Sequence, residues 1–446
     1  MSTESTGLDN NYAAAFRAMR SSAHEPAWLS ELRERSFEIF ARTGLPSVKE
    51  EEWKYTNVAQ IEKTSFQPIT KVDGGRPVSD LELAAWTYEE ARESRLVFVN
   101  GAFRKDLSAT GGIADGLVAL DFATALQTPQ YEETIRRSLE KENENGFAAL
   151  NAALFSNALF LKFPRGFVAP APVHLLFLTA AANGDQPASF PRVLVHAEPG
   201  SAATLIESYH ATSERRYLTN ARTDLVLEDE ARIMHYKVQR ESGEGFHVAA
   251  TEVELGRNSF YQSTSINLGG RLSRHDIDVS MDHEGAECWV DGLYMIEGEQ
   301  HTDTHSVIDH RQPHCTSRQL YKGILDGKSR AVFNGKVFVR HGAQQTDAQQ
   351  TNKNLLLSKE AQVDTKPQLE IFADDVKCTH GAAVGQLEED ELFYLESRGI
   401  NPALARNMLT YGFAEEVIER IKIDSIRREL DRAVLNRLHS EFQIEA

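Results

Sequence analysis

Apolar residues near the N-terminus recur at helical spacing, and the pattern then becomes mixed. The face of the first predicted helix consists of Trp28, Leu29, Leu32, Ile39 and Phe40. Gly44 followed by Pro46 is typical of a helix end. Further along, we expect a strand at Leu96 to Val99, closed by Asn100-Gly101, and a helix from Tyr131 to about Asn157. Residues 1–160 are therefore predicted to form a mostly helical N-terminal domain.

From about Leu161 the pattern changes to short apolar or alternating runs between glycine, asparagine and aspartate residues. Such runs predict strands. They include Leu175 to Leu178, Val193 to Val195, Val253 with Leu255, Ile277 with Val279 and Met281, Trp289-Val290, Val337 with Val339, and Leu369 with Ile371. We interpret Asn334-Gly335 as a turn within this region.

Residues 161–386 are thus rich in strands but lack the long intervening helices of a doubly wound parallel sheet. A β-solenoid, a double-sheet barrel and a sandwich all fit this pattern. No exact internal repeat is present, so periodicity alone does not choose among the three architectures.

The last part of the chain, residues 387–446, is predicted to be helical again. Asn401-Pro402 is typical of an N-cap followed by the first turn of a helix. An apolar stripe with one residue every four positions follows, made of Ile426, Leu430, Val434 and Leu438. A helical hairpin with one apolar stripe can cover the end of a β core or bind a partner protein.

Composition narrows the function classes. Across 446 residues, 48 lysine and arginine residues against 66 aspartate and glutamate residues give a formal charge of −18. Such a surface repels nucleic acid and anionic lipid. Three cysteines are too few for a secreted disulfide framework, no run is long and apolar enough to span a membrane, and the first residues are polar. We therefore expect a cytoplasmic protein.

Side chains that bind metals are concentrated between positions 275 and 380. They are His275, His283, His301, His305, His310, His314, His341 and His380, together with Cys288, Cys315 and Cys378. Strand alternation places His301, Asp303 and His305 on one face. Structural zinc sites usually show a CxxC or HxxxH pair with a second pair nearby, and the four-residue spacing from His301 to His305 does not converge in a strand or loop as it does on a helix. A hydrogen-bonded loop is thus favoured over a metal site for the region from His301 to Cys315.

Cys378 and His380 also share one strand face. Two side chains are too few for an iron-sulfur cluster, which is held by about four. A functional pair would need further ligands, most simply from another subunit, and its cysteine should be partly exposed. On composition alone, a buried thiol beside a hydrogen-bonded imidazole is the favoured interpretation. No phosphate-binding loop, nucleophile elbow, zinc-protease pair or dinucleotide fingerprint is present.

Several segments resemble the SufD family, within the SufB/SufD superfamily of the SUF iron-sulfur cluster assembly complex. The resemblance is dense from about 330 to 413 and is supported by Pro46 to Thr56, which includes Glu51, Glu52, Trp53 and Tyr55. The segments that carry it are Phe333 to Val339, Gln344 to Leu357, Leu369 to Ala382 and Phe393 to Gly399.

The resemblance implies a mainly β protein with a right-handed parallel β-helix core over residues 161–386 and helical domains at both ends. It also implies two partners: the SufB paralogue, which pairs through the β-helices, and the ATPase SufC, which binds the C-terminal helices of residues 387–446. The docking residues would then include Phe393, Tyr394, Arg398, Met408 and Phe413. ATPase activity would reside in SufC, and this chain would be a non-catalytic scaffold.

The essential cysteine of SufB lies upstream of a Leu-Glu-His-Glu segment, where this chain has Cys378-Thr-His-Gly381 and, opposite the cysteine, Ala361. This difference places the chain with SufD rather than SufB. The resemblance implies that His380 is a shared iron-sulfur ligand at the SufB interface, with Cys378 as its neighbour. A transient cluster would form there, and none would be tightly bound by the chain alone.

The residues leave two other function classes open. One is a metal-dependent hydrolase or lyase on a β-helix that uses the histidines from His301 to His314. The other is a purely structural β-helix without a ligand role. The sequence also leaves open whether the complex holds a reduced flavin and whether the isolated chain forms a homodimer.

Overall fold

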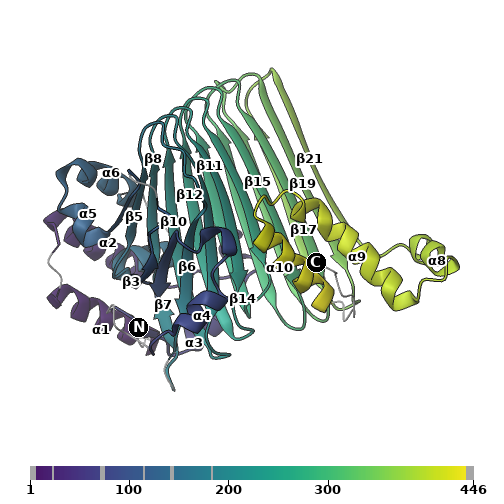
Figure 1. Ribbon diagram of the computed structural model, residues 1–446, viewed down its shortest axis with the longest axis horizontal. Helices are drawn as coiled ribbons and strands as arrows, with labels where there is room; N and C mark the ends of the chain where they lie inside the picture. The colour runs from purple at the N-terminus through teal and green to yellow at the C-terminus, as the bar shows by residue number, and fades with distance from the viewer. Residues whose placement is uncertain are drawn as a thin grey trace.

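The computed structural model describes residues 7–22, 25–70, 76–113, 116–140, 145–181 and 184–437. Its centre is a parallel β-helix in which two large sheets face each other (Figure 1). From residue 192 onward, successive strands alternate between the two sheets, and each strand pairs in parallel with the strand one turn further along the chain. The β-solenoid is therefore the correct choice among the three architectures, and helices flank it at both ends, as the resemblance implies.

The strands of the first sheet, which we call sheet 1, are β1 (Gln67–Pro68), β4 (Val118–Asp121), β5 (Leu159–Phe163), β7 (Pro187–Ser189), β8 (Arg192–Ala197), β10 (Tyr217–Leu227), β12 (Gly245–Leu255), β14 (Leu272–Met281), β16 (His301–His310), β18 (Arg330–Val339) and β20 (Gln362–Ile371). Those of sheet 2 are β2 (Arg95–Val99), β3 (Ala102–Ala109), β6 (Val173–Thr179), β9 (Ala202–Ala211), β11 (Arg232–Arg240), β13 (Phe260–Asn267), β15 (Glu287–Ile296), β17 (Thr316–Leu325), β19 (Thr346–Leu356) and β21 (Val376–Gly385).

Helices gather at the two ends of the chain. The N-terminal ones are α1 (Gly7–Ser22), α2 (Ala27–Thr43), α3 (Ala59–Lys63), α4 (Asp80–Ala85), α5 (Phe122–Leu126), α6 (Pro129–Leu139) and α7 (Gly146–Leu154), with the short 3-10 helices η1 (Glu51–Trp53) and η2 (Glu89–Ala91). The C-terminal ones are α8 (Glu389–Ser397), α9 (Pro402–Ile418) and α10 (Asp424–Arg437).

Side chains paired in register form columns inside the β-helix. Leu225 pairs with Val253, for example, and Ile308 pairs with Val337 one turn after it. Because alternate residues of a strand point to opposite faces, the alternating pattern puts one apolar set inside, and successive turns bury these side chains against one another. One aliphatic column consists of Leu225, Val253, Val279, Ile308, Val337 and Leu369.

Two local predictions are wrong. Asn334-Gly335 is not a turn but the middle of β18. Gly335 faces the interior, where a Cβ atom would lie 2.3 Å from Nε2 of Gln350, so glycine serves close packing there. The predicted helix from Tyr131 to about Asn157 is two helices, because α6 ends at Leu139 and Asn145 caps the start of α7.

The other predicted elements are present. The first helix is α2, which ends at Gly44, and the strand at Leu96 to Val99 is β2. Asn401 caps α9 by accepting hydrogen bonds from the N–H groups of Ala403 and Leu404. The stripe of α10 packs on the outer face of sheet 2, where Ile426, Leu430 and Val434 are fully buried. Leu438, the fourth residue of this stripe, lies outside the described residues.

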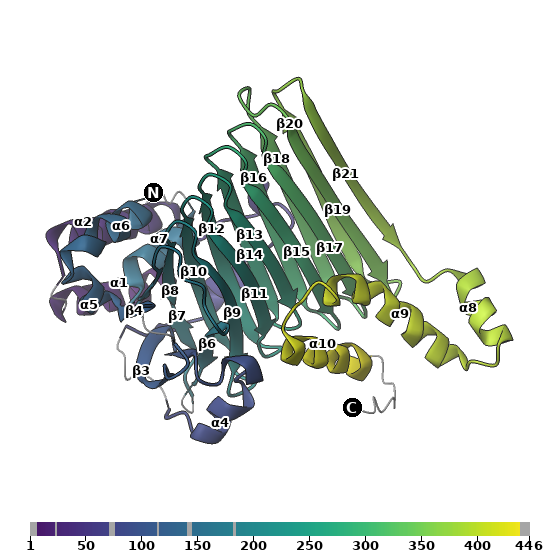
Figure 2. The ribbon, with the colours of Figure 1, turned by 45° about the horizontal axis from the view of Figure 1, so that its top comes forward.

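The two ends of the β-helix differ. The N-terminal helices cover the first turns, where Phe147 and Leu150 of α7 belong to one apolar cluster with Leu194 and Leu218 of sheet 1. The last strands, β20 and β21, each pair with one neighbour, and none of their residues is fully buried. Figure 2 shows these strands at the free end of the β-helix, with α8 projecting beyond the body. The last turn is therefore open.

Candidate functional site

Cys378 and His380 lie on β21 in the open last turn. Cys378 pairs in register with Ala348 of β19, and His380 pairs with Gln350. Ala348 is fully buried in the core between the sheets, and Cys378 packs against that core. Because residues two apart on a strand share a face, His380 also lies on the inner face of the β-helix. His380 is nevertheless exposed, since β21 is the last strand of its sheet.

Solvent access separates Cys378 from the other two cysteines. Cys288 and Cys315 are fully buried, whereas Cys378 is half-buried. Burial raises the pKa of all three thiols. Cys378 is therefore a neutral thiol until a metal ion or a cationic neighbour stabilises its thiolate, but it can be reached from outside. It meets the expectation that a working cysteine is partly exposed.

The open turn holds too few ligands for a metal centre of its own. The described residues contain no group of three or more histidine, cysteine, aspartate or glutamate side chains placed to hold a metal ion. A neutral imidazole and a thiolate suit iron-sulfur chemistry, but a cluster needs about four ligands. The pair Cys378 and His380 can thus supply part of a ligand set, at a surface where another chain could supply the rest.

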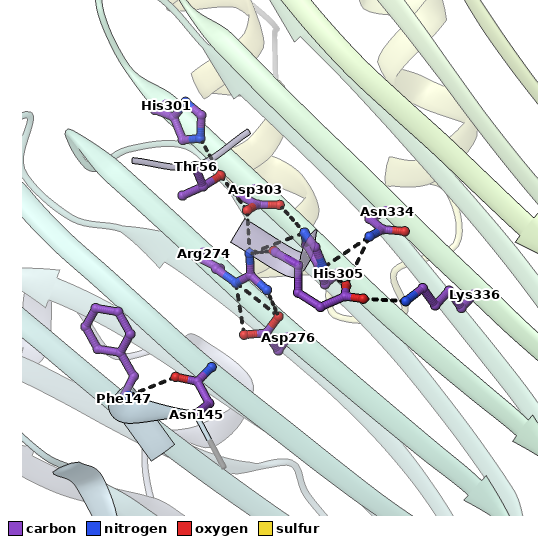
Figure 3. A network of polar contacts seen from close by, with 11 residues as sticks. Thr56, Asn145, Phe147, Arg274, Asp276, His301, Asp303, His305, Asn334 and Lys336 are labelled. Carbon is purple, nitrogen blue, oxygen red and sulfur yellow. Dashed lines mark hydrogen bonds and ion pairs between the residues drawn. The ribbon is translucent and has the colours of Figure 1, made fainter. Parts of the chain in front are cut away.

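A second group of polar residues lies on the outer face of sheet 1 (Figure 3). As strand alternation predicts, His301, Asp303 and His305 share one face of β16. The hydroxyl group of Thr56 donates a hydrogen bond of 2.5 Å to Asp303 and lies 2.9 Å from Nε2 of His301. Arg274 of β14 pairs with Asp303 at 2.8 Å.

This group fixes residues 51–56, which we call the N-terminal clasp, to the β-helix. The ring of His305 lies between two carboxylates: its Nε2 atom is 3.0 Å from Oδ1 of Asp303, and its Nδ1 atom is 3.3 Å from Oε2 of Glu52. Glu52 also pairs with Lys336 of β18 at 2.5 Å, and its carbonyl oxygen accepts a hydrogen bond from Arg274. The guanidinium group of Arg274 stacks on Trp53, 3.8 Å from the ring centre. Side chains from three strands therefore hold the clasp in place.

The electrostatic environment of this group favours the protonated form of His305 and the ionised form of Glu52. Burial opposes the protonated form of His305, but Asp303 and Glu52 outweigh burial and raise the pKa of His305 to about 9. The hydrogen bond from His305, with help from Lys336, lowers the pKa of Glu52 to about 2. Burial lowers the pKa of His301, which favours its neutral form. The arrangement is a hydrogen-bonded ion-pair network.

The remaining histidines predicted with this group do not join it. His310 is buried and hydrogen-bonded to Ser317, at 2.8 Å. His314 is exposed in a turn, 3.9 Å from Glu284. Cys315 donates from its buried thiol to the carbonyl oxygen of His283. The structural interpretation of the region from His301 to Cys315 therefore fits the geometry, although hydrogen-bonded strand residues form most of it rather than a loop.

The residues expected to dock a partner divide into two groups. Phe393, Tyr394 and Met408 are 71%, 57% and 45% exposed, and Arg398 is exposed with its guanidinium group over the ring of Tyr394. Phe413 instead packs against the apolar cluster between sheet 2 and the helices, and its carbonyl oxygen accepts a hydrogen bond from Lys322. Phe413 is thus a packing residue of α9.

Sequence reasoning missed two residues that matter here. Arg274 connects the N-terminal clasp to Asp303, and the only sequence signal for it was a cation near Asp276 on a predicted strand. Gln350 is the in-register neighbour of His380, and its position within a polar run of β19 gave no signal. Both assignments require knowledge of which strands are paired, which the sequence pattern did not supply.

Comparison with known proteins matches nearly the whole chain. The family model described as the SufBD protein N-terminal region matches residues 6–175, and the model described as SUF system FeS cluster assembly, SufBD core domain, matches residues 178–413. In the described ranges, no helix has the length and apolar character needed to cross a membrane.

Individual relatives agree over similar lengths. The chain is 35% identical to an iron-sulfur cluster assembly SufBD family protein of Synechocystis, over 96% of this chain and 95% of the relative. It is 34% identical to the iron-sulfur cluster assembly protein SufD of Escherichia coli, over 89% and 90%. The SufD protein of Bacillus subtilis is 26% identical, over 95% and 96%.

Proposed function

The chain belongs to the SufBD family of iron-sulfur cluster assembly proteins, and we propose that it is a scaffold subunit that pairs with the SufB paralogue and docks the ATPase SufC. A nascent cluster forms at the seam between the two β-helices. The observation that carries this proposal is the position of His380, exposed on the inner face of the open last turn.

The open turn supports pairing with another β-helix. An edge strand has unpaired backbone N–H and C=O groups that can extend a sheet into a second chain. Apolar side chains at this end are also exposed: Ile371, Phe372 and Val384 are 41%, 46% and 47% accessible. Exposed apolar groups beside free strand edges are typical of an interface. SufB is the paralogue expected to provide a matching β-helix.

The ligand shortage supports a shared cluster. His380 provides an imidazole and Cys378 a thiol that metal binding would deprotonate. About two further ligands are needed to hold a cluster, and SufB supplies them, including its essential cysteine. The iron-sulfur cluster is the product of assembly rather than a resident cofactor of this chain.

The C-terminal helices support docking of SufC. None of the residues of α8 is buried, and Figure 2 shows this helix extending away from the β-helix. The exposed rings of Phe393 and Tyr394 lie on α8, and Met408 lies on α9. Exposed aromatic residues are frequent anchors in protein interfaces. The ATPase activity belongs to SufC, and this chain takes no catalytic step.

Contacts of α9 with sheet 2 provide a route by which motion of SufC reaches the seam. Lys322 of β17 donates a hydrogen bond of 2.8 Å to the carbonyl oxygen of Phe413. Arg420, just after α9, pairs at 2.9 Å with the buried Asp291 of β15. When ATP binding draws two SufC subunits together, displacement of α9 is passed to these strands and opens the seam at the last turn.

The decisive experiment replaces His380 with alanine in a complementation assay that measures cluster delivery. His380→Ala should abolish delivery while leaving the melting temperature unchanged, because the side chain is exposed. Thr379→Ala is the matched control, since Thr379 is an exposed neighbour on the opposite strand face. Normal delivery by His380→Ala would reject the ligand role.

A further inference from the structure

We propose that Gln350 is a positioning residue for His380. Its amide oxygen accepts a hydrogen bond from one ring nitrogen of His380 and thereby turns the other ring nitrogen toward the iron. This inference rests on the proposed function, because it assigns a role to Gln350 at the same seam.

The strand register brings the two side chains together. Gln350 of β19 is the direct partner of His380 of β21, and the preceding inner-face pair is Ala348 with Cys378. In a parallel sheet, residues paired in register point to the same face at neighbouring positions. Gln350 is 2% exposed, whereas His380 lies at the surface. Gln350 is therefore the buried residue immediately behind His380.

A chain of hydrogen bonds fixes the orientation of the Gln350 amide. Its Nε2 atom donates to Oε1 of Gln319 at 2.6 Å. The Nε2 atom of Gln319 in turn donates to the hydroxyl group of Ser306 at 2.8 Å. Both Gln319 and Ser306 are buried. Because Nε2 of Gln350 is held by Gln319, the free end of the amide is its oxygen.

That oxygen has no hydrogen-bond partner among the described residues, although it is shielded from solvent. A buried acceptor without a donor is unfavourable and is rare in folded proteins. Gly335 of β18 lies against the same amide, and a Cβ atom there would be 2.3 Å from Nε2. Glycine at this position makes room for Gln350 rather than forcing it outward.

The chemistry of a histidine ligand explains what the oxygen is for. A neutral imidazole that binds a metal through one nitrogen carries a proton on the other, and this N–H group needs an acceptor. Water can serve while the turn is open. Once SufB covers the turn, water is excluded, and the oxygen of Gln350 is the acceptor already in place behind the ring. The acceptor then selects both the tautomer and the ring orientation.

The first test measures the adjacency in the isolated full-length chain. Histidine labelled with ¹⁵N allows the two ring nitrogens of His380 to be observed by NMR. Gln350→Glu places a charged acceptor at the same position and should shift the ¹⁵N resonance of the hydrogen-bonded ring nitrogen, because hydrogen bonds to a charged acceptor are stronger than neutral ones. The Gln319 amide can turn over, so that it donates to the new carboxylate and accepts from Ser306. Gln349→Glu, whose side chain lies on the outer face, is the control and should cause a much smaller change. Unchanged ring ¹⁵N resonances of His380 in Gln350→Glu would overturn the inference.

The second test measures cluster assembly on the complex of this chain with SufB and SufC. Gln350→Leu removes the acceptor and should lower the assembly rate about 10-fold to 100-fold, as loss of such supporting groups does at metal sites. Gln350→Glu keeps an acceptor and should retain most of the rate, whereas a merely structural role would not distinguish the two variants in this order. Melting temperatures of both variants identify any loss of folding.

His380→Ala distinguishes failure of the ligand role of His380 from failure of the positioning role of Gln350. If His380→Ala assembles clusters normally, the proposed ligand role fails. If His380→Ala is inactive while folded Gln350→Leu assembles clusters at the rate of the unchanged chain, the ligand role stands and the positioning role of Gln350 is wrong.

Discussion

The buried carboxylate of Asp303 holds the N-terminal clasp against the outer face of sheet 1. It is 1% exposed and contacts Thr56, Arg274 and His305. Burial alone would disfavour its charge, but Arg274 and His305 lower its pKa. The charge of Asp303 in turn raises the pKa of His305, so that the N-terminal clasp depends on a protonated imidazole.

This dependence predicts how stability changes with pH. The folded-state pKa of His305 is about 9, above the unfolded value of about 6.5. A raised pKa stabilises the fold fully below pH 6.5, and this contribution is lost as the pH rises to about 9, with an upper limit of about 3 kcal/mol. Urea unfolding between pH 6 and pH 9.5 should show this loss.

His305→Gln should remove this part of the pH dependence. His283→Gln is the control, since His283 is exposed in a turn. A protein whose free energy of unfolding falls equally in His305→Gln and in the unchanged chain over this pH range would contradict the assignment.

At the level of residues, the sequence predicted positions correctly where the prediction depended only on alternation within a single strand. Alternation was sufficient to place His301, Asp303 and His305 on one face. It did not show that Thr56, more distant in sequence, meets this face, because that contact depends on how the clasp folds back. The turn predicted at Asn334-Gly335 is wrong for a related reason. Glycine favours turns, but Gly335 instead allows close packing against Gln350, a residue of the opposite sheet.

At the scale of elements, α8 differs from α9 and α10. The last two helices bury Ile418, Ile426 and Leu430 against sheet 2 or between themselves, whereas α8 has no buried residue. Deletion of residues 387–446 would uncover the outer face of sheet 2 and could not distinguish lost docking from lost folding. Substitutions on α8 avoid this difficulty.

The double substitution Phe393→Asp and Tyr394→Asp should therefore weaken binding of SufC without unfolding the chain. Loss of two exposed aromatic anchors is expected to lower the affinity at least about 10-fold. Calorimetric titration of the full-length chain with SufC measures the effect. Leu81→Asp on α4, where Leu81 is 80% exposed, is the control for adding a charge at an exposed apolar site. Unchanged affinity in the double variant would exclude α8 from the docking surface.

Helices and strands were predicted correctly where the sequence signal for their ends was specific to a few residue types. The caps at Gly44 and Asn401 were identified because few residue types can occupy them. The helix predicted from Tyr131 to Asn157 merged two helices, although residues 140–145 between them are all polar and Asn145 is a typical N-cap. The strands were found, but their order in the sheets was not, since parallel pairing between turns leaves no local signature.

On the scale of the whole molecule, the β-helix has one covered end and one open end. If the open end pairs with SufB, a charge placed there should block pairing. Val384→Lys introduces an ammonium group at an exposed inner-face position of β21. Isolation of a tag-bearing chain expressed with both partners should then recover SufC but little SufB, because a buried unpaired charge is unfavourable.

Val168→Lys is the matched control, since Val168 is also exposed but lies near the first turns, beside Ala202. It should recover both partners. Recovery of SufB in normal amounts with Val384→Lys would show that pairing uses another face of the molecule.

The unequal ends also limit how many copies can join. A rod with two free edges can add neighbours without limit and grow into a fibre. Here the N-terminal helices pack at one end of the β-helix, and the open last turn lies at the other (Figure 1). If the open last turn is the pairing surface proposed above, two molecules that pair through it leave no open turn for a third. The helices at the start of the chain would then limit end-to-end association of the β-helix to pairs.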